Sequence, residues 1–195
     1  MDIRCADTIR LDPKTHIYWL GKLKKPGYSE IVRDLGIAKP NPFWTDAGLE
    51  EGKMLHEWLL FLAQGKVPAQ PPDPSIAGRV AGIEKFIRDT GFKIMGGEVP
   101  QYDPVLDFAC TPDLWGSIGV WTWVIEAKGG AKLPTHRLQT VAQQVALSAG
   151  GFRAQKRGCL YLRDEGYRLD EHTDARDRSN WRNIVPAWHA MQEYK

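Results

Sequence analysis

Apolar residues in the N-terminal third of the chain recur at spacings that predict a small hairpin followed by two helices. Residues 8–20 form two short β-like runs on either side of the turn Asp12-Pro13-Lys14. Residues 28–35 have the pattern of a short helix that ends at Gly36. Residues 44–64 predict a longer amphipathic helix, ended by Gly65, whose apolar face carries Leu49, Leu55, Leu59 and Leu62.

A proline-rich stretch at residues 67–74 (VPAQPPDP) separates this N-terminal arm from the rest, because proline lacks the amide donor that a helix needs. Beyond it, Ser75 is the expected N-cap of a helix that runs to Arg88 and is closed by Gly91. The elements expected next are strands at 92–101, 105–114 and 120–128, a helix at 135–149 and a strand at 157–162. A strand at 166–172 and a helix at 177–193, kinked or restarted at Pro186, complete the chain. The core order is therefore α-β-β-β-α-β.

Length and composition favour one domain. The chain has 195 residues, of which 43% are hydrophobic, and this is enough to bury a core. We expect a single domain, 1–195, with an N-terminal hairpin and helical arm (1–66), a core (74–163) and a C-terminal strand and helix (164–195). The 26 Lys and Arg residues against 24 Asp and Glu residues leave a net charge of +2. Any affinity for nucleic acid must therefore come from local clustering of positive charge.

The cysteines Cys5, Cys110 and Cys159 are too few and too scattered for a disulfide framework or an iron–sulfur cluster. The first ten residues carry charges where a signal peptide would be apolar, and no run approaches the roughly 18 apolar residues of a membrane span. We therefore expect a soluble, cytoplasmic protein.

Acidic and basic residues converge on one pair of predicted strands. Glu126 and Lys128 are two apart in a strand, so their side chains emerge on the same face. Asp113 lies near the end of the preceding strand, which an antiparallel hairpin would bring beside Glu126. An isolated Glu-x-Lys is usually a surface salt bridge, but the apolar neighbours in the strand VWTWVIEAK indicate burial, where charges are rare unless paired or bound to a metal. Carboxylates that hold a divalent cation beside a lysine are suited to phosphodiester hydrolysis.

These residues resemble the PD-(D/E)XK nucleases, and within them the RecB-like and phage recombination exonuclease branch. The resemblance covers most of the chain, with Thr111-Pro112-Asp113 and Glu126-Ala127-Lys128 in the positions of the motif. It implies a restriction-endonuclease-like α/β fold, in which helices flank a mixed central sheet. It further implies that Asp113, Glu126 and the Ala127 carbonyl bind the metal, and that Lys128 serves the attacking water and the phosphate.

Three more residues are candidates through the same resemblance. Gly52 to His56 is similar to the Gly-x-x-x-His of RecB-like members and makes His56 a nitrogen ligand, although a lone histidine more often packs between helices. Glu98 resembles an added acidic ligand of phage-type members, with a surface glutamate as the alternative. Gln139 resembles the first residue of a Gln-x-x-x-Tyr motif that would orient the phosphate or the strand of Glu126, with a solvent-facing glutamine as the alternative. In this chain Gln143 stands where that motif has tyrosine.

The implied function is an exonuclease that uses one or two Mg²⁺ or Mn²⁺ ions in phage-like DNA replication, recombination or repair, in a bacterial or phage-infected cytosol. Its substrate would be double-stranded DNA ends or single-stranded DNA, with backbone contacts expected at Arg153, Lys156 and Arg157. The resemblance leaves open a homo-oligomer and a recombination-protein partner. A structure-specific or restriction-like endonuclease and a catalytically inactive nucleic-acid-binding module remain as alternatives.

Overall fold

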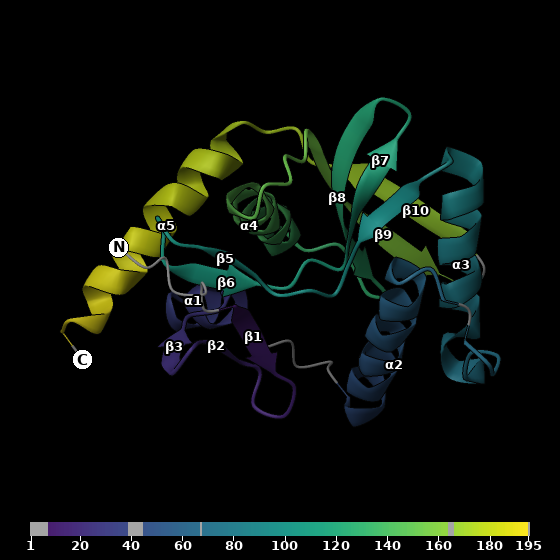
Figure 1. Cartoon of the computed structure of the whole chain (residues 1–195), viewed down its shortest axis with the longest axis horizontal. Coiled ribbons are helices and arrows are strands. Elements are labelled where there is room, and N and C mark those ends of the chain that lie inside the picture. The colour runs from purple at the N-terminus through teal and green to yellow at the C-terminus, as the bar shows by residue number, and fades with distance from the viewer. Residues whose placement is uncertain (1–7, 39–44, 67, 164–165, 195) are drawn as a thin grey trace, which may run out of the picture.

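A mixed five-stranded sheet forms the centre of the protein in the computed structural model, which describes residues 8–38, 45–66, 68–163 and 166–194. The strand order is β10-β9-β8-β7-β4 (Figure 1). All neighbours run antiparallel except β8 and β9, which are parallel and are connected by a helix. The strands are β4 (Lys93–Gly96), β7 (Leu114–Ile118), β8 (Trp121–Lys128), β9 (Lys156–Arg163) and β10 (Gly166–Glu171).

Helices cover both faces of this sheet. On one face lies α3 (Pro74–Thr90), together with α2 (Asp46–Ala63); on the other lies α4 (Thr135–Ala149), backed by α5 (Arg176–Gln192) (Figure 1). The core order α3-β4-β7-β8-α4-β9 is the predicted α-β-β-β-α-β, and the fold is a restriction-endonuclease-like α/β core.

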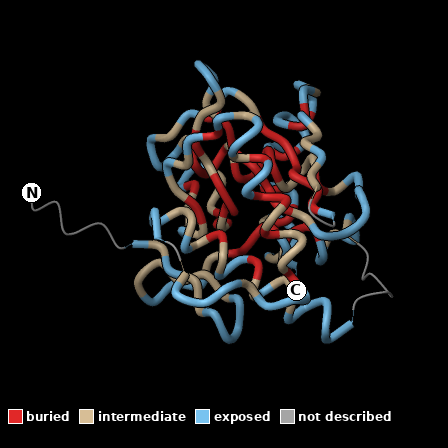
Figure 2. Tube along the Cα trace, turned by 90° about the vertical axis from the view of Figure 1, so that its right-hand side faces the viewer, coloured by how far each residue is buried: buried red, intermediate tan, exposed pale blue. Residues whose placement is uncertain are grey.

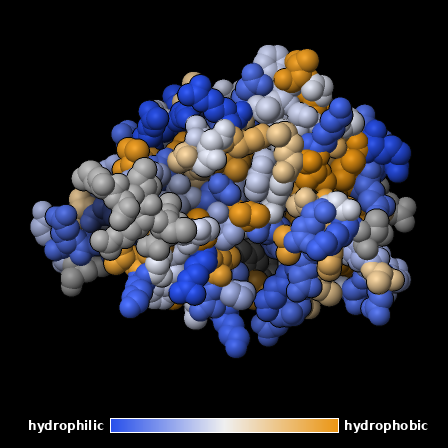
Figure 3. Space-filling view, viewed as in Figure 1, coloured by the Kyte–Doolittle hydropathy of each residue, from blue (hydrophilic) through white to orange (hydrophobic). Residues whose placement is uncertain are grey.

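Apolar side chains from the two faces form separate cores. The core between the sheet and helices α2 and α3 includes Leu59, Ile83, Phe86, Leu114, Ile125 and Leu160. The core between α4, α5 and the N-terminal elements includes Ile31, Phe108, Val141, Ala142, Trp181 and Val185. Buried residues therefore occupy the centre of the chain trace, with exposed ones around it (Figure 2). On the face seen in Figure 3, polar residues dominate and apolar residues appear only in small groups. No helix in the described residues is long and apolar enough to cross a membrane.

The first two core strands differ from the prediction. The expected strand 92–101 covers β4 and only the first residue of β5 (Gln101–Asp103), and the expected strand 105–114 covers β6 (Phe108–Cys110) and only the first residue of β7. β5 and β6 form a two-stranded sheet of their own. The chain leaves the central sheet at Gly97, where a Cβ atom would lie 2.3 Å from the Asp113 carbonyl oxygen, and Glu98 adopts a left-handed φ of 53°. This close approach involves residues far apart in the sequence, which periodicity does not reveal.

The N-terminal arm contains one strand more than the sequence predicts. β1 (Ile9–Asp12) and β2 (Ile17–Leu20) form the expected hairpin, and β3 (Leu23–Lys25) adds an unpredicted third strand. The short helix α1 (Tyr28–Asp34) follows. The Tyr18 hydroxyl lies 2.9 Å from that of Thr111, so the hairpin supports the segment that carries Asp113.

The predicted glycines stand at the helix ends, but the N-cap of α3 and the course of α5 at Pro186 differ from the prediction. Gly36, Gly65 and Gly91 take left-handed φ values of 64–66° at or just after helix ends. The N-cap of α3 is Asp73 and not Ser75, because the Asp73 carboxylate accepts from the Ser75 amide at 2.9 Å and Pro74 fits the first helical position. Helix α5 is not restarted at Pro186 but continues through it.

Candidate active site

Asp113 and Glu126 meet at one edge of the central sheet. Leu114 pairs with Ile125 in the antiparallel β7–β8 register, so Asp113, immediately before β7, lies opposite the end of β8 that carries Glu126. The Asp113 Oδ2 atom accepts from the Ala127 amide at 2.7 Å. Both carboxylates are buried, with 2% and 1% exposure. The structure thus brings the predicted pair together, although Asp113 precedes its strand instead of lying near the end of one.

The Glu126 carboxylate is surrounded by hydrogen-bond donors. Lys128 emerges on the same face of β8 and donates to Oε1. Gln139, on α4, donates to the same oxygen at 2.6 Å, and Gln143, one turn further along α4, donates to Oε2. The solvent-facing alternative for Gln139 is therefore wrong.

A second group of ligand-type atoms lies next to Asp113. His56, on α2, places Nδ1 2.7 Å from Glu98 Oε1 and 3.6 Å from Asp113 Oδ1. One ligand atom from each of these three residues lies within 4.8 Å of the others. The left-handed turn at Glu98, whose amide donates to the Pro112 carbonyl at 2.9 Å, directs this side chain to the site. Residues from an N-terminal helix, a turn and a strand start thus share one small volume.

Charges in this group shift one another's pKa values. Burial, reinforced by the Glu126 carboxylate, raises the pKa of Asp113 well above its usual range, and burial raises that of Glu98. The Asp113 carboxylate raises the pKa of His56 to about 10. Burial opposes protonation of Lys128, but Glu126 and Asp113 outweigh it and raise the lysine's pKa. Negative charge is therefore concentrated here at an electrostatic cost that a cation relieves.

The donor set fits a divalent cation. Carboxylate oxygens from Glu98 and Asp113 are the ligands that Mg²⁺ and Mn²⁺ prefer, and an imidazole nitrogen from His56 is better suited to Mn²⁺ than to Mg²⁺. Glu126 and the Ala127 peptide adjoin this group through the hydrogen bond from Ala127 to Asp113. The residues present are therefore suited to holding a divalent cation.

The fold and the site together define an α/β protein in which two buried carboxylates lie next to a lysine and a partly exposed histidine at a sheet edge. A scan of the sequence against protein-family models found no match, and a search of curated proteins found none. Among solved structures, an alkaline exonuclease (LHK-Exo) from Laribacter hongkongensis is similar at 18% identity and a TM-score of 0.47, covering 87% of this chain and 88% of that chain. LHK-Exo in complex with dAMP gives 17% identity, a TM-score of 0.42 and the same coverage of 87% and 88%. A protein described as SSO0001 gives 15% identity and a TM-score of 0.38, covering 84% of this chain and 82% of that chain. At these values the similarity carries no activity over to this chain.

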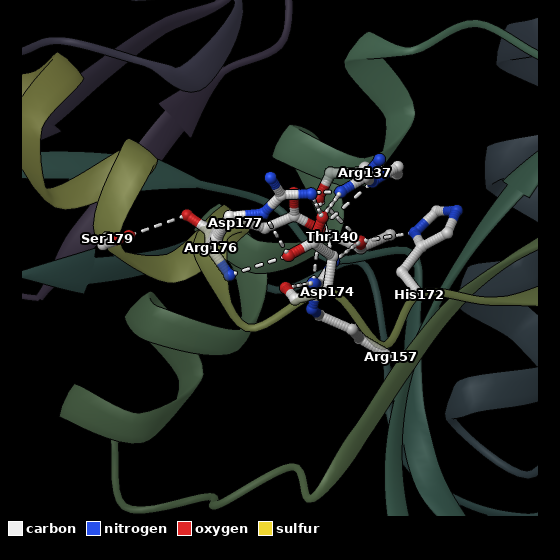
Figure 4. Close-up of polar contacts among 8 residues, drawn as sticks. All are labelled: Arg137, Thr140, Arg157, His172, Asp174, Arg176, Asp177 and Ser179. Atoms are coloured by element: carbon white, nitrogen blue, oxygen red, sulfur yellow. Dashed lines mark hydrogen bonds and ion pairs between the residues drawn. The ribbon is translucent and has the colours of Figure 1, made fainter.

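The predicted DNA contact of Arg157 is corrected by the structure. Its side chain is buried beneath α4 and α5, where the guanidinium donates to Asp177 at 2.6 Å and to the carbonyls of Arg137 and Asp174 (Figure 4). A guanidinium whose donors are taken up inside the protein does not reach a DNA phosphate. Arg157 instead ties β9 to the two helices.

Arg153 and Lys156 lie away from the carboxylates. Lys156 is in register with Trp123, three residues before Glu126, and by alternation faces the opposite side of the sheet. Its ammonium lies over the Trp121 and Trp123 rings at 5.4 and 5.2 Å from their centroids. Arg153 is exposed just before β9. Contact of these two residues with DNA stays a prediction.

Gln143 contacts Glu126 in the site, although the sequence alone assigned it no role. Its amide bonds Glu126 from within the core, with 1% of the residue exposed. Its spacing of four from Gln139 places both on one helical face, and this was the available signal. The departure from the usual tyrosine obscured it.

Proposed function

We propose that the protein is a divalent-metal-dependent deoxyribonuclease that hydrolyses DNA phosphodiester bonds, and that it works as an exonuclease in phage-like DNA replication, recombination or repair. The observation that carries the proposal is the convergence of the buried Asp113 and Glu126 carboxylates with Glu98, Lys128 and the partly exposed His56 at one sheet edge. A surface salt bridge between Glu126 and Lys128, the ordinary interpretation of this triplet, does not account for a carboxylate with 1% exposure beside two further carboxylates.

Each residue has a distinct role in this proposal. His56, Glu98 and Asp113 would hold a Mg²⁺ or Mn²⁺ ion, with Glu126 and the Ala127 carbonyl as further ligands for one ion or for a second. When bound, the ion supplies charge neutralisation at the phosphate and a water of lowered pKa. Lys128 donates to Glu126 and places its positive charge beside the position of the phosphate, where negative charge grows during hydrolysis. Gln139 orients the Glu126 carboxylate through its 2.6 Å hydrogen bond.

Cleavage of linear and circular DNA in parallel tests this function. The purified protein is incubated with each substrate in Mg²⁺, Mn²⁺ or EDTA, beside Asp113→Asn as a matched control. The asparagine keeps an oxygen for the Ala127 amide and loses the charge. We expect metal-dependent degradation of linear DNA only, and a loss of about 100-fold or more in the variant.

The other outcomes identify the alternatives. Cleavage of closed circular DNA would favour an endonuclease, and DNA binding without cleavage in either metal would favour an inactive module. Full activity of folded Asp113→Asn would show that Asp113 is not part of the active site. Glu126→Ala, which deletes the second carboxylate, should behave in the same way as Asp113→Asn.

A further inference from the structure

The two oxygens of the Glu126 carboxylate are held unequally. Oε1 accepts from both Lys128 and Gln139. Among the residues that the structure describes, Gln143 is the one side chain that donates to Oε2. Loss of one donor at Oε1 therefore leaves a substitute, whereas loss of the donor at Oε2 leaves none.

This asymmetry matters because the terminal torsion of glutamate is soft. Rotation of a carboxylate about its last bond has broad, roughly two-fold minima, unlike the sharp staggered wells of sp³ carbons. Donors on a single oxygen leave the other free to swing, while donors on both oxygens fix the plane of the group. Gln139 and Gln143, four residues apart on α4, approach the two oxygens from the same helix face.

The orientation of the Gln143 amide follows from its surroundings. An ionised carboxylate only accepts hydrogen bonds, so the NH₂ group of Gln143 must face Glu126. The Gln143 Oε1 atom is buried and has no hydrogen-bond partner in the described part of the chain. A buried amide that leaves its own acceptor unpaired is unfavourable as a purely structural element. In the part of the chain that the structure describes, the one hydrogen bond of the Gln143 side chain is the one to Glu126.

We infer that Gln143 is a positioning residue that fixes the plane of the Glu126 carboxylate by holding Oε2, with Gln139 and Lys128 holding Oε1. The inference rests on the proposed function for the consequence that this orientation matters for metal binding and cleavage. The arrangement itself exists in the protein alone. The Gln-x-x-x-Tyr motif has a tyrosine at this position, so in this chain an amide takes the place of a phenol.

We call the hold of Gln143 on Oε2 and of Gln139 and Lys128 on Oε1 of Glu126 the carboxylate clamp. The clamp is tested first without metal or DNA. In the metal-free protein we expect the side-chain amide resonances of Gln143 to be protected from exchange and to shift on Glu126→Gln. The matched control is Gln144, whose amide donates to the Ala154 carbonyl at 2.7 Å and should not respond. A thermal double-mutant cycle of Gln143→Met with Glu126→Gln should give a combined shift that differs from the sum of the single shifts. The clamp would be overturned if the Gln143 amide resonances exchanged freely and did not shift on Glu126→Gln, or if the shifts in melting temperature were additive. The resonance measurement needs no variant at position 143.

The consequence is tested with Mn²⁺ by calorimetry and by single-turnover cleavage. We expect Gln143→Met to weaken Mn²⁺ binding and slow cleavage by about 10- to 100-fold, Gln139→Met to do less because Lys128 still holds Oε1, and Gln144→Met to change neither. Unchanged Mn²⁺ affinity and rate in Gln143→Met, or an equal loss in Gln144→Met, would overturn the positioning role. If the wild-type protein shows the clamp but neither binds Mn²⁺ nor cleaves DNA, the proposed function fails and the clamp stands.

Discussion

His56 contacts the candidate metal group through one ring nitrogen. Nδ1 lies 2.7 Å from Glu98, and 48% of the side chain is exposed, so the ring reaches the site from its open side. A histidine that only packs between helices would be expected to have its ring enclosed.

This geometry gives a prediction about metal preference. We expect His56→Asn, which keeps a hydrogen-bonding amide near the position of Nδ1, to weaken Mn²⁺ binding and to narrow the preference for Mn²⁺ over Mg²⁺, because imidazole suits Mn²⁺ better. Titration of each metal against cleavage and calorimetric heat measures it. An unchanged metal dependence with a lowered melting temperature would favour a structural role.

Lys128 allows binding to be separated from chemistry. An ammonium and a metal ion repel, so we expect Lys128→Met to keep its affinity for Mn²⁺ and DNA, with Glu126 still held by both glutamines. The cleavage step should slow by roughly two to three orders of magnitude, since positive charge beside the phosphate is lost. Lys128→Arg should not restore it fully, because a planar guanidinium is bulkier. Single-turnover rates and both affinities are measured on the same variants.

Two results would contradict this prediction. Cleavage near the wild-type rate would make Lys128 a salt-bridge partner of Glu126 and nothing more. A collapse of Mn²⁺ affinity would show that the lysine supports the ligands instead of the phosphate.

Helix α2 carries a glycine one turn before His56. Gly52 lies in the interior of the helix, and a Cβ atom built there has no neighbour within 4 Å. Glycine in a helix is less stable than alanine by about 0.5–1 kcal/mol. Helix α2 is therefore less stable than it would be with alanine at position 52, which lies on the same face as His56.

We expect Gly52→Ala to stabilise the DNA-free protein by about 0.5–1 kcal/mol and to weaken DNA binding, because the added methyl group occupies space beside the site. Urea denaturation measures the first effect and a binding titration the second. A variant that is stabilised and binds DNA as before would show that the space is not used by the substrate. A destabilised variant would contradict the open surroundings of Gly52.

Local patterns predicted the elements better than the contacts between them. The helices at 28–35 and 135–149 and the last core strand were predictable, because each repeats its apolar spacing within one segment. The break after β4, inside the expected strand 92–101, was not, because the chain leaves the central sheet where Gly97 approaches Asp113. The same distinction holds at the site. The shared face of Glu126 and Lys128 follows from the period of a strand, whereas the contact between His56 and Glu98 depends on how α2 packs.

Beneath α4 and α5, a polar network joins β9 to both helices and includes His172 (Figure 4). His172 Nδ1 lies 2.9 Å from the Thr140 hydroxyl. Burial and the nearby Arg157 guanidinium lower the pKa of His172 to about 4, from 6.5. The folded protein thus keeps this ring neutral over a pH range in which the unfolded chain protonates it.

The expected consequence is acid sensitivity between pH 6.5 and 4. The unfolded state binds the proton first, so the stability present above pH 6.5 falls as the pH drops towards 4, by up to about 3 kcal/mol for this one group. His172→Asn keeps a partner for Thr140 but does not titrate, so it should lose less stability over this range. Free energies of unfolding in urea at pH 7 and pH 4.5 provide the comparison. Equal losses in both proteins would contradict the low pKa.

The two outer strands of the central sheet bear on how copies of the protein behave toward one another. An edge strand presents unpaired amides and carbonyls that can template pairing with another chain. In the described residues β10 is one such edge and carries Arg168, Asp170 and Glu171, while β4, the other, has four residues and a register shift between Ile94 and Gly96. Charged side chains and a bulged, short strand both oppose edge-to-edge addition. The same sheet that holds the carboxylates is thereby protected from aggregation through its backbone.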